Sequence, residues 1–199
     1  IAIERIQYFE PKDGSGYYVA FSGGKDSIVV KDLVKRSGVK YDIHFNLTTV
    51  DPPELIAYTR KYHKDVEEHK AEKSMFKLIV EKRFLPTRNE RFCCRYLKEH
   101  GGEGRNVITG IRWQESQKRK QRRMFEAKRG DKRTFFLHPI IDWTNAEIWQ
   151  YITENKLPYC SLYDEGWKRI GCVGCPNADR KRQFNRWPRF KRAYLAAAA

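Results

Sequence analysis

Short apolar runs alternate with amphipathic segments along most of this chain. Runs rich in β-branched and aromatic residues predict four strands, at 17–22, 41–50, 106–111 and 134–141. Apolar residues at helical spacing predict helices at 26–36, 54–68, 74–84 and 143–156. Strands that alternate with helices are typical of a parallel sheet with crossover helices. We therefore expect an α/β fold: a mostly parallel, twisted sheet with helices on both faces.

The pattern changes at Leu157, where a turn-rich loop with three cysteines begins and a basic, aromatic helix follows. Because no repeat or linker divides the chain, we expect one domain over 1–199, with segment 157–195 packed on it as a cysteine-containing loop and helix. No apolar run approaches the ~20 residues that a membrane helix needs, and no signal-peptide pattern is present. These features favour a soluble, cytoplasmic protein with no membrane partner.

Positive charge is concentrated in two segments of the chain. Segment 117–133 contains nine Lys and Arg against two acidic residues, and segment 180–192 contains seven and no acidic residue, in a chain of net charge +15. Such concentration indicates a polyanionic ligand, although a solvated basic face would give the same composition. The residues we expect to contact phosphate or nucleic acid are Arg119, Arg122, Arg123, Arg182 and Arg186.

A glycine-containing motif lies between the first expected strand and the first expected helix: Ser22-Gly23-Gly24-Lys25-Asp26-Ser27. The glycines let the backbone approach an anion, and the N–H groups and dipole of a helix start attract its negative charge. Lys25 adds a positive charge, and the two serines add hydroxyl donors. The motif is neither a Walker A loop nor a GxGxxG loop. It predicts a phosphate site made by all six residues, with an ordinary Gly-Gly turn as the alternative.

The SGGKDS motif resembles the signature of the PP-loop ATP pyrophosphatase superfamily, which has an adenine-nucleotide α-hydrolase-like fold. Three later segments resemble the phosphoadenosine phosphosulfate reductase family, so that the resemblance covers roughly 17–178. These segments are TGIR at 109–112, HPIIDWT at 138–144 and LPY…LYDEG at 157–166.

This resemblance implies that the loop holds the phosphates of ATP or of an adenylyl-sulfate nucleotide. It also implies that Gly110 allows the backbone to approach the nucleotide and that Arg112 contacts phosphate or sulfate. On this basis Lys25, Asp26 and Arg112 are the expected catalytic residues. Asp51 and Glu54 are candidates to bind Mg²⁺ beside the phosphates, or to cap a helix instead.

Four of the five cysteines form the pattern Cys93-Cys94 … Cys172-Val173-Gly174-Cys175. Four thiolates can bind a [4Fe–4S] cluster or a structural Zn²⁺, and reduced free thiols are the third possibility. The pattern resembles the cluster motif of iron–sulfur adenylyl-sulfate reductases. Cys160 is a candidate sulfur-carrying nucleophile or a passive loop residue. The five histidines show no HxxxH or HxH spacing, so we expect ordinary strand and surface roles for them.

Three functions fit these features. The first is ATP-dependent sulfur transfer to DNA or RNA, as the resemblance to DNA phosphorothioation sulfurtransferases implies, with a cysteine desulfurase as sulfur donor. The second is reduction of adenylyl-sulfate or 3′-phosphoadenylyl-sulfate to sulfite, with a thioredoxin-like electron donor. The third is a non-catalytic partner that only binds a nucleotide or nucleic acid. The ECGLH-like tail of reductases that form a thiosulfonate has no counterpart in this sequence, and the turn TTVDPPE (48–54) replaces the usual TGxxFPET.

Overall fold

A computed structural model describes all residues from 1 to 199. One six-stranded sheet has the order β3-β2-β1-β4-β6-β5. Its strands are β1 (Tyr17–Ala20), β2 (Tyr41–Leu47), β3 (Glu67–Lys70), β4 (Asn106–Ile108), β5 (Phe125–Lys128) and β6 (Asp131–Leu137). All neighbouring pairs are parallel except β5 and β6. The expected mostly parallel α/β sheet is confirmed.

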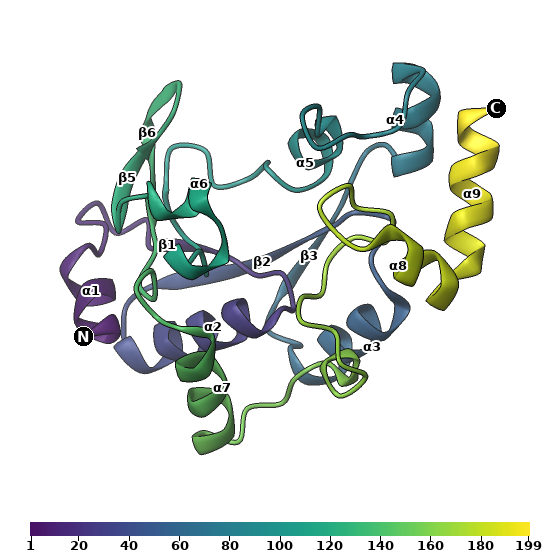
Figure 1. Cartoon of the computed structure of the whole chain (residues 1–199). Helices are drawn as coiled ribbons and strands as arrows, with labels where there is room; N and C mark the ends of the chain where they lie inside the picture. The colour runs from purple at the N-terminus through teal and green to yellow at the C-terminus, as the bar shows by residue number, and fades with distance from the viewer.

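Helices cover the sheet from two sides, with α2, α3 and α7 on one side and α4, α5 and α6 on the other (Figure 1). The helices are α1 (Ala2–Tyr8), α2 (Lys25–Ser37), α3 (Pro53–Tyr62), α4 (Met75–Lys82), α5 (Phe92–Leu97), α6 (Gln117–Lys120), α7 (Asn145–Glu154), α8 (Arg180–Arg186) and α9 (Pro188–Ala198). Two 3₁₀ turns, η1 (Trp113–Glu115) and η2 (Ser161–Tyr163), complete the elements. No helix is both long enough and apolar enough to span a bilayer.

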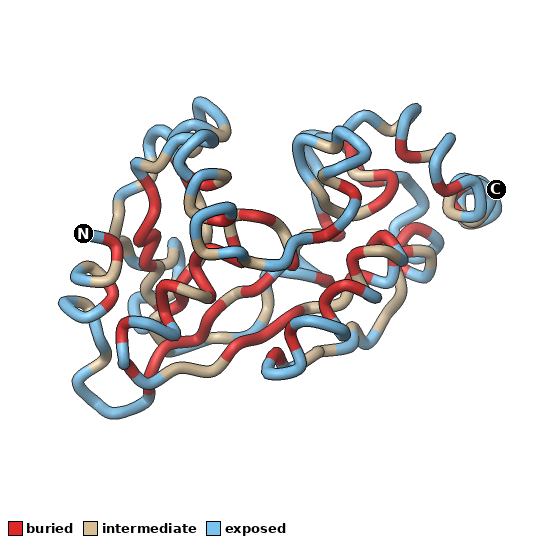
Figure 2. Tube along the Cα trace, turned by 90° about the horizontal axis from the view of Figure 1, so that it is seen from below, coloured by how far each residue is buried: buried red, intermediate tan, exposed pale blue.

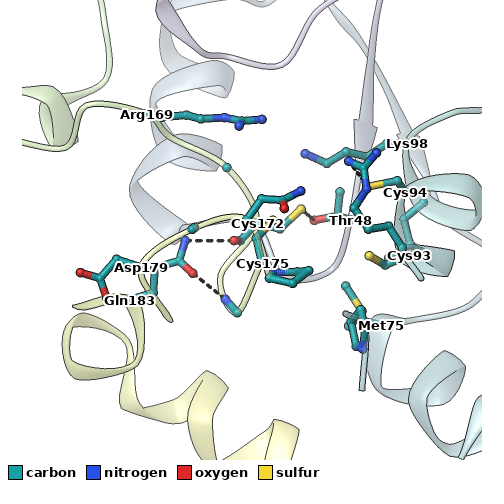
Figure 3. A pocket seen from close by; sticks show the side chains of 18 of the residues that line it. Thr48, Met75, Cys93, Cys94, Lys98, Arg169, Cys172, Cys175, Asp179 and Gln183 are labelled. Atoms are coloured by element: carbon teal, nitrogen blue, oxygen red, sulfur yellow. Dashed lines mark hydrogen bonds between the residues drawn. The ribbon is translucent and has the colours of Figure 1, made fainter. Parts of the chain in front are cut away.

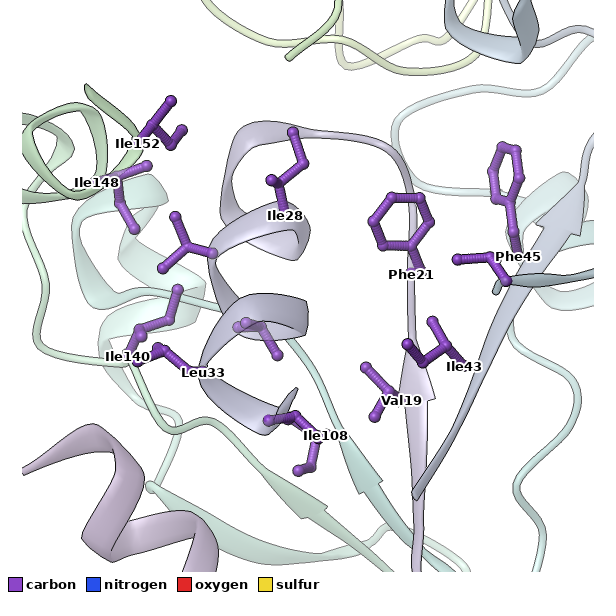
Figure 4. Close-up of a cluster of buried hydrophobic side chains, with 14 of the residues drawn as sticks. Val19, Phe21, Ile28, Leu33, Ile43, Phe45, Ile108, Ile140, Ile148 and Ile152 are labelled. Atoms are coloured by element: carbon purple, nitrogen blue, oxygen red, sulfur yellow. The ribbon is translucent and has the colours of Figure 1, made fainter. Parts of the chain in front are cut away.

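The main hydrophobic core lies between the sheet and α2, where the buried parts of the trace converge (Figure 2). Alternate residues of a strand face opposite sides of a sheet, so Ile43 and Phe45 of β2 point to the same side. They meet Ile28 and Leu33 of α2 in this core, together with Val19 of β1 (Figure 4). This packing fixes the start of α2, which carries the phosphate motif.

A second, smaller core joins α4, α5 and α9. Its members are Val50, Met75, Leu78, Ile79, Phe92, Cys93, Leu97 and Tyr194. The hydroxyl of Tyr194 donates to the carbonyl oxygen of Val173 over 2.9 Å, and Val173 itself belongs to the main core. The C-terminal segment therefore packs against both cores and connects them.

Several predicted boundaries are wrong, and the strands are shorter than expected at their carboxyl ends. β1 stops at Ala20, β4 at Ile108 and β6 at Leu137, and the residues beyond form loops at one edge of the sheet. The predicted helix 54–68 ends at Tyr62, and its last residues begin β3. β3 has the polar sequence EEHK at the sheet edge, so no apolar pattern identifies it.

The C-terminal half differs in two further ways. The basic stretch after β4 contains α6 and β5, neither of which the sequence predicts. The single expected basic helix is two helices, because Pro188 has no N–H and disfavours helical backbone at Trp187, whose φ and ψ are −127° and 72°. The predicted helix 143–156 is present as α7, which begins with a capping box: Thr144 accepts from the Glu147 N–H, and Glu147 accepts from the Thr144 N–H.

Candidate nucleotide loop and cysteine cavity

The nucleotide loop, residues 22–27, leaves β1 and enters α2. Gly23 has a φ of +68°, and a Cβ at this position would lie 2.6 Å from Cδ1 of Leu55. Glycine is therefore required here by backbone conformation and by space. Gly24 is the N-cap of α2 and offers no side-chain cap, so the helix start keeps N–H groups for another partner. One of them, the Lys25 N–H, donates to the Tyr163 hydroxyl over 2.8 Å.

The serines of the loop bind each other and the backbone. Ser27 Oγ donates to the Gly24 carbonyl oxygen over 2.8 Å, and it lies 3.2 Å from both the N and the Oγ of Ser22. These bonds hold the two ends of the loop together. The loop is therefore shaped before any ligand arrives.

Asp26 forms ion pairs with both expected catalytic cations, Arg112 and Lys25. Its Oδ1 accepts from Nε of Arg112 over 2.6 Å, and its Oδ2 accepts from Nζ of Lys25 over 3.2 Å. Arg112 is 2% exposed and also donates to the Trp143 carbonyl oxygen. A Cβ on Gly110 would lie 3.0 Å from the Asp26 backbone, so this glycine is needed for close packing. In this structure Arg112 holds Asp26, and the implied contact of Arg112 with phosphate or sulfate stays a prediction.

The cysteine cavity is a space of about 340 Å³ beside the carboxyl end of β2. Cys93 and Cys94 reach it from α5, and Cys172 and Cys175 reach it from the loop before α8 (Figure 3). That loop is anchored by the Val173 N–H, which donates to the Val50 carbonyl oxygen over 2.8 Å. The cationic residues that line the cavity are Arg91, Lys98, Lys168, Arg169 and Arg182.

The cations and the thiols of the cavity influence each other's ionisation. The Cys93 thiol donates a hydrogen bond to Cys94, and this bond, with Arg91 and Lys98 nearby, lowers the pKa of Cys94 while that of Cys93 is raised. Burial raises the pKa of Cys172. Cys172 in turn raises the pKa of Lys98. Arg91 and Lys98 thus favour the thiolate of Cys94, whereas burial opposes ionisation of Cys172.

The sulfurs of the cavity are too far apart to form a tetrahedral zinc site as they stand. No three of its sulfurs lie within 4.8 Å of one another. A tetrahedral zinc site with Zn–S bonds of about 2.3 Å would bring each pair of sulfurs to about 3.8 Å. A [4Fe–4S] cluster places its thiolates farther apart, because each one binds a different iron atom. The sulfur positions therefore disfavour a preformed zinc site.

The structure gives no support to three weaker candidates. Cys160 is fully buried and burial raises its pKa, which disfavours a nucleophile. Asp51 accepts from the Thr48 N–H over 2.6 Å, so it stabilises a turn. Glu54 accepts from Nε1 of Trp187 over 3.0 Å and pairs with Arg186 over 2.7 Å. Both carboxylates therefore already have partners within the protein.

The expected polyanion contacts lie in two separate places, because α6 and α8 lie well apart in the fold (Figure 1). Arg119 pairs with Glu115, Arg122 pairs with Glu126, and Arg186 pairs with both Glu54 and Glu165. Arg182 lies 4.2 Å from the ring centre of Trp167 and donates to two backbone carbonyls. The guanidinium of Arg123 has no carboxylate within 4.0 Å, and the residue is exposed.

Sequence reasoning missed several residues that shape these sites. Tyr163 contacts the helix start, Thr48 accepts from Cys172 Sγ over 3.4 Å, and Lys98 lies in the cysteine cavity. Only Tyr163 belongs to a recognised motif, LYDEG, which gives no hint of its partner. His44 and His69 also form a close pair at 2.7 Å that their spacing does not indicate.

The sheet order, the loop after β1 and its place at the carboxyl edge define a PP-loop nucleotide-binding fold. The family model of the phosphoadenosine phosphosulfate reductase domain matches residues 16–178. The chain belongs to this family.

Two relatives and two solved structures illustrate the comparison. An uncharacterized protein of Methanocaldococcus jannaschii is 32% identical over 184 residues, covering 86% of this chain and 44% of that protein. The adenosine 5′-phosphosulfate reductase of Lysinibacillus sphaericus is 26% identical, covering 87% of this chain and 79% of that protein. Phosphoadenylyl-sulfate reductase from Candida auris shares the fold, with a TM-score of 0.65, 21% identity and coverage of 86% and 87% of the two chains. The U34-tRNA thiolase NcsA from Methanococcus maripaludis, with its [4Fe–4S] cluster, gives a TM-score of 0.52, 11% identity and coverage of 99% and 74%.

Proposed function

We propose that this protein binds ATP or an adenylyl-sulfate at the nucleotide loop and performs sulfur chemistry with a [4Fe–4S] cluster in the cysteine cavity. One observation carries the proposal: four cysteines from two distant segments line one cationic cavity near the carboxyl end of β2, at the sheet edge where the nucleotide loop leaves β1. β1 and β2 are parallel neighbours and end at the same edge. β1 leads into the nucleotide loop, and β2 leads to Thr48 in the cavity wall.

Each part of the site has a distinct task in this proposal. The N–H groups at the start of α2 and the Lys25 ammonium bind phosphate oxygens, and Asp26 and Arg112 hold that helix start in place. Cys93, Cys94, Cys172 and Cys175 hold the cluster, whose iron would supply a binding position for sulfur when the cluster is present. The lining cations balance the negative charge of the thiolates.

We favour ATP-dependent sulfur transfer to nucleic acid as the reaction. ATP would adenylate an oxygen of the polymer with release of pyrophosphate, and a sulfide would then attack the centre that bears this oxygen and displace AMP. A persulfide would displace AMP in the same way, and a second thiol would then cleave the resulting disulfide to release the thiolated polymer. The charged groups of exposed residues such as Lys118, Lys120 and Arg123 have no carboxylate within 4.0 Å, and these cations exceed what one nucleotide needs. The tRNA thiolase named above has the same fold, so this architecture can accommodate both the cluster and this chemistry.

Reduction of an adenylyl-sulfate to sulfite is the second candidate. It is favoured by the Lysinibacillus reductase, most of whose length this chain covers. In this reaction the nucleotide loop would hold the phosphates of the adenylyl-sulfate, and an external thiol donor would supply the two electrons that release sulfite and AMP.

One experiment separates the two reactions. Protein purified without oxygen is incubated either with ATP, RNA or DNA and sulfide, or with adenylyl-sulfate and a dithiol, and pyrophosphate, AMP and sulfite are measured. Pyrophosphate that depends on the polymer supports sulfur transfer, and sulfite supports the reductase. Neither product, combined with tight nucleotide binding, would favour a non-catalytic binding protein. Lys25→Ala should abolish either activity, whereas Cys160→Ala should retain it.

A further inference from the structure

A second group of side chains with metal-ligand atoms lies on β2 and β3, and none of its residues lines the cysteine cavity. β2 and β3 pair in parallel, with His44 beside Glu67 and Asn46 beside His69. Because side chains two residues apart on a strand share a face, His44, Glu67 and His69 all project from the same face of the sheet. This face is opposite the one that carries Ile43 and Phe45 into the main core.

Three ligand atoms of this group converge. His44 Nδ1 lies 2.7 Å from His69 Nε2 and 3.5 Å from a carboxylate oxygen of Glu67. His69 Nε2 lies 3.8 Å from the other Glu67 oxygen. Among the His, Cys, Asp and Glu residues of the chain, this is the group of three whose ligand atoms all lie within 4.8 Å of one another.

The other side of the His44 ring is fixed by a carboxylate. His44 Nε2 contacts the carboxylate of Asp42, which in turn is held by both terminal nitrogens of Arg105. A carboxylate at Nε2 keeps a proton on that nitrogen and leaves the Nδ1 lone pair directed at His69 and Glu67. This carboxylate–histidine arrangement is the usual support of a zinc-binding imidazole.

Burial makes one ligand rigid and leaves the other two accessible. The His44 side chain is 9% exposed, and its ring stacks on Tyr18 with centroids 4.0 Å apart. The side chains of His69 and Glu67 are 34% and 65% exposed. An ion can therefore enter from solvent. A tetrahedral zinc ion with Zn–N bonds of about 2.0–2.1 Å needs the two nitrogens at about 3.3 Å, a small shift for the more exposed His69.

We propose that His44, Glu67 and His69 bind a divalent transition metal ion, with zinc as the expected ion. Two imidazoles and one carboxylate are zinc donors, whereas Mg²⁺ and Ca²⁺ prefer oxygen ligands alone. The ion joins the short edge strand β3 to β2. Three protein ligands leave a fourth position open to water or an anion from solvent.

The test is a titration of the whole protein with Co²⁺, followed by competition with Zn²⁺. Thiolate ligands give intense sulfur-to-cobalt absorption bands, so an ion in the cysteine cavity is recognised separately. Besides any Co²⁺ in the cysteine cavity, we expect one Co²⁺ per protein that produces only weak ligand-field bands. One Zn²⁺ should displace this ion. Zn²⁺ should also raise the thermal unfolding temperature.

Matched variants identify the ligands. His69→Ala and Glu67→Gln should each weaken the binding of this ion by at least tenfold and remove its effect on the thermal unfolding temperature. Asp42→Asn should weaken the binding of this ion about 10–100-fold, as the loss of a carboxylate that supports a metal-binding histidine does in other metal sites. Glu68→Gln is the control, because Glu68 is next in sequence but pairs with Arg60, and it should change nothing. Circular dichroism of each metal-free variant verifies that it folds.

Two results would overturn the proposal. One is a wild-type protein in which all bound Co²⁺ shows sulfur bands. The other is equal affinity in folded His69→Ala and wild type. Neither result would bear on the cluster or on nucleotide binding, because the cysteine cavity and the nucleotide loop share no residue with this site.

Discussion

Gly23 is the position in the nucleotide loop where one added methyl group should do the most damage. Its φ of +68° lies in the left-handed region, which costs other residues about 1–2 kcal/mol. The new Cβ would also lie 2.6 Å from Leu55 Cδ1 and 3.1 Å from Thr59 Oγ1. Leu55 is 2% exposed, and overpacking such a core costs about 1–3 kcal/mol. We expect Gly23→Ala to lower the free energy of unfolding by about 2–5 kcal/mol.

Gly38 provides the matched control for this substitution. Its φ is +73°, and a Cβ there would have no atom within 4 Å. Gly38→Ala should therefore show the backbone cost alone, about 1–2 kcal/mol. Urea unfolding followed by circular dichroism measures both variants, and the difference between them reports the contact with Leu55. Leu55→Val should recover part of that difference in the Gly23→Ala background, as a double-mutant cycle would reveal.

Gly24→Ala separates folding from ligand binding at the same loop. Gly24 has a φ of −79°, and a Cβ would make ordinary contacts at 3.5 and 3.6 Å with Ser22 and Tyr163. The free energy of unfolding of Gly24→Ala should change by less than about 1 kcal/mol. Its ATP affinity should fall at least about tenfold, because the added methyl group lies where the anion would approach the backbone. Equal unfolding free energies for Gly23→Ala and Gly38→Ala would refute the steric argument. Unchanged ATP affinity in Gly24→Ala would refute the role of the loop.

Three further predictions concern other parts of the molecule. Cys175→Ser should lose the brown colour, iron and acid-labile sulfide of protein purified without oxygen, whereas Cys160→Ala should keep all three; equal iron in both variants would contradict the assignment. Burial lowers the pKa of His63 to about 4, so the unfolded chain takes up a proton first, and stability should fall by up to about 3 kcal/mol as the pH drops from 6.5 to 4. His63→Gln should flatten that part of the pH curve of urea unfolding, and a curve as steep as that of wild type would disprove the cause. Arg123→Ala should reduce RNA or DNA affinity and its salt dependence, measured by fluorescence anisotropy, more than Arg186→Ala does; the reverse order would count against a polymer contact at α6.

The centre of the fold could be predicted because burial dictates its sequence. The four predicted strands are neighbours in the sheet and carry apolar side chains into the main core. β3 could not be predicted from its sequence, EEHK, because an edge strand with exposed residues needs no apolar pattern. β5 lies in a basic segment, and it forms through antiparallel pairing with β6 rather than through any pattern of its own.

Sites made by contiguous residues were visible in the sequence, and sites made across elements were not. The nucleotide loop could be predicted because one turn supplies its glycines, its lysine and its helix start. The cysteine pairs were visible because each pair is local, although the convergence of Cys94 and Cys175 depends on how α5 packs. The pair of His44 and His69 depends on the register between two parallel strands. That register is a tertiary property, so histidine spacing along the chain cannot reveal it.

The basic segments illustrate the same distinction for charge. Segment 180–192 contains no acidic residue, yet its Arg186 pairs with Glu54 from α3 and with Glu165 from the preceding loop. Glu115, just outside segment 117–133, likewise pairs with Arg119. Folding therefore neutralises part of the charge that composition assigns to a ligand. The cations available to a polyanion are therefore the exposed ones whose charged groups no carboxylate reaches, such as the Arg123 guanidinium, and not the full net charge of the chain.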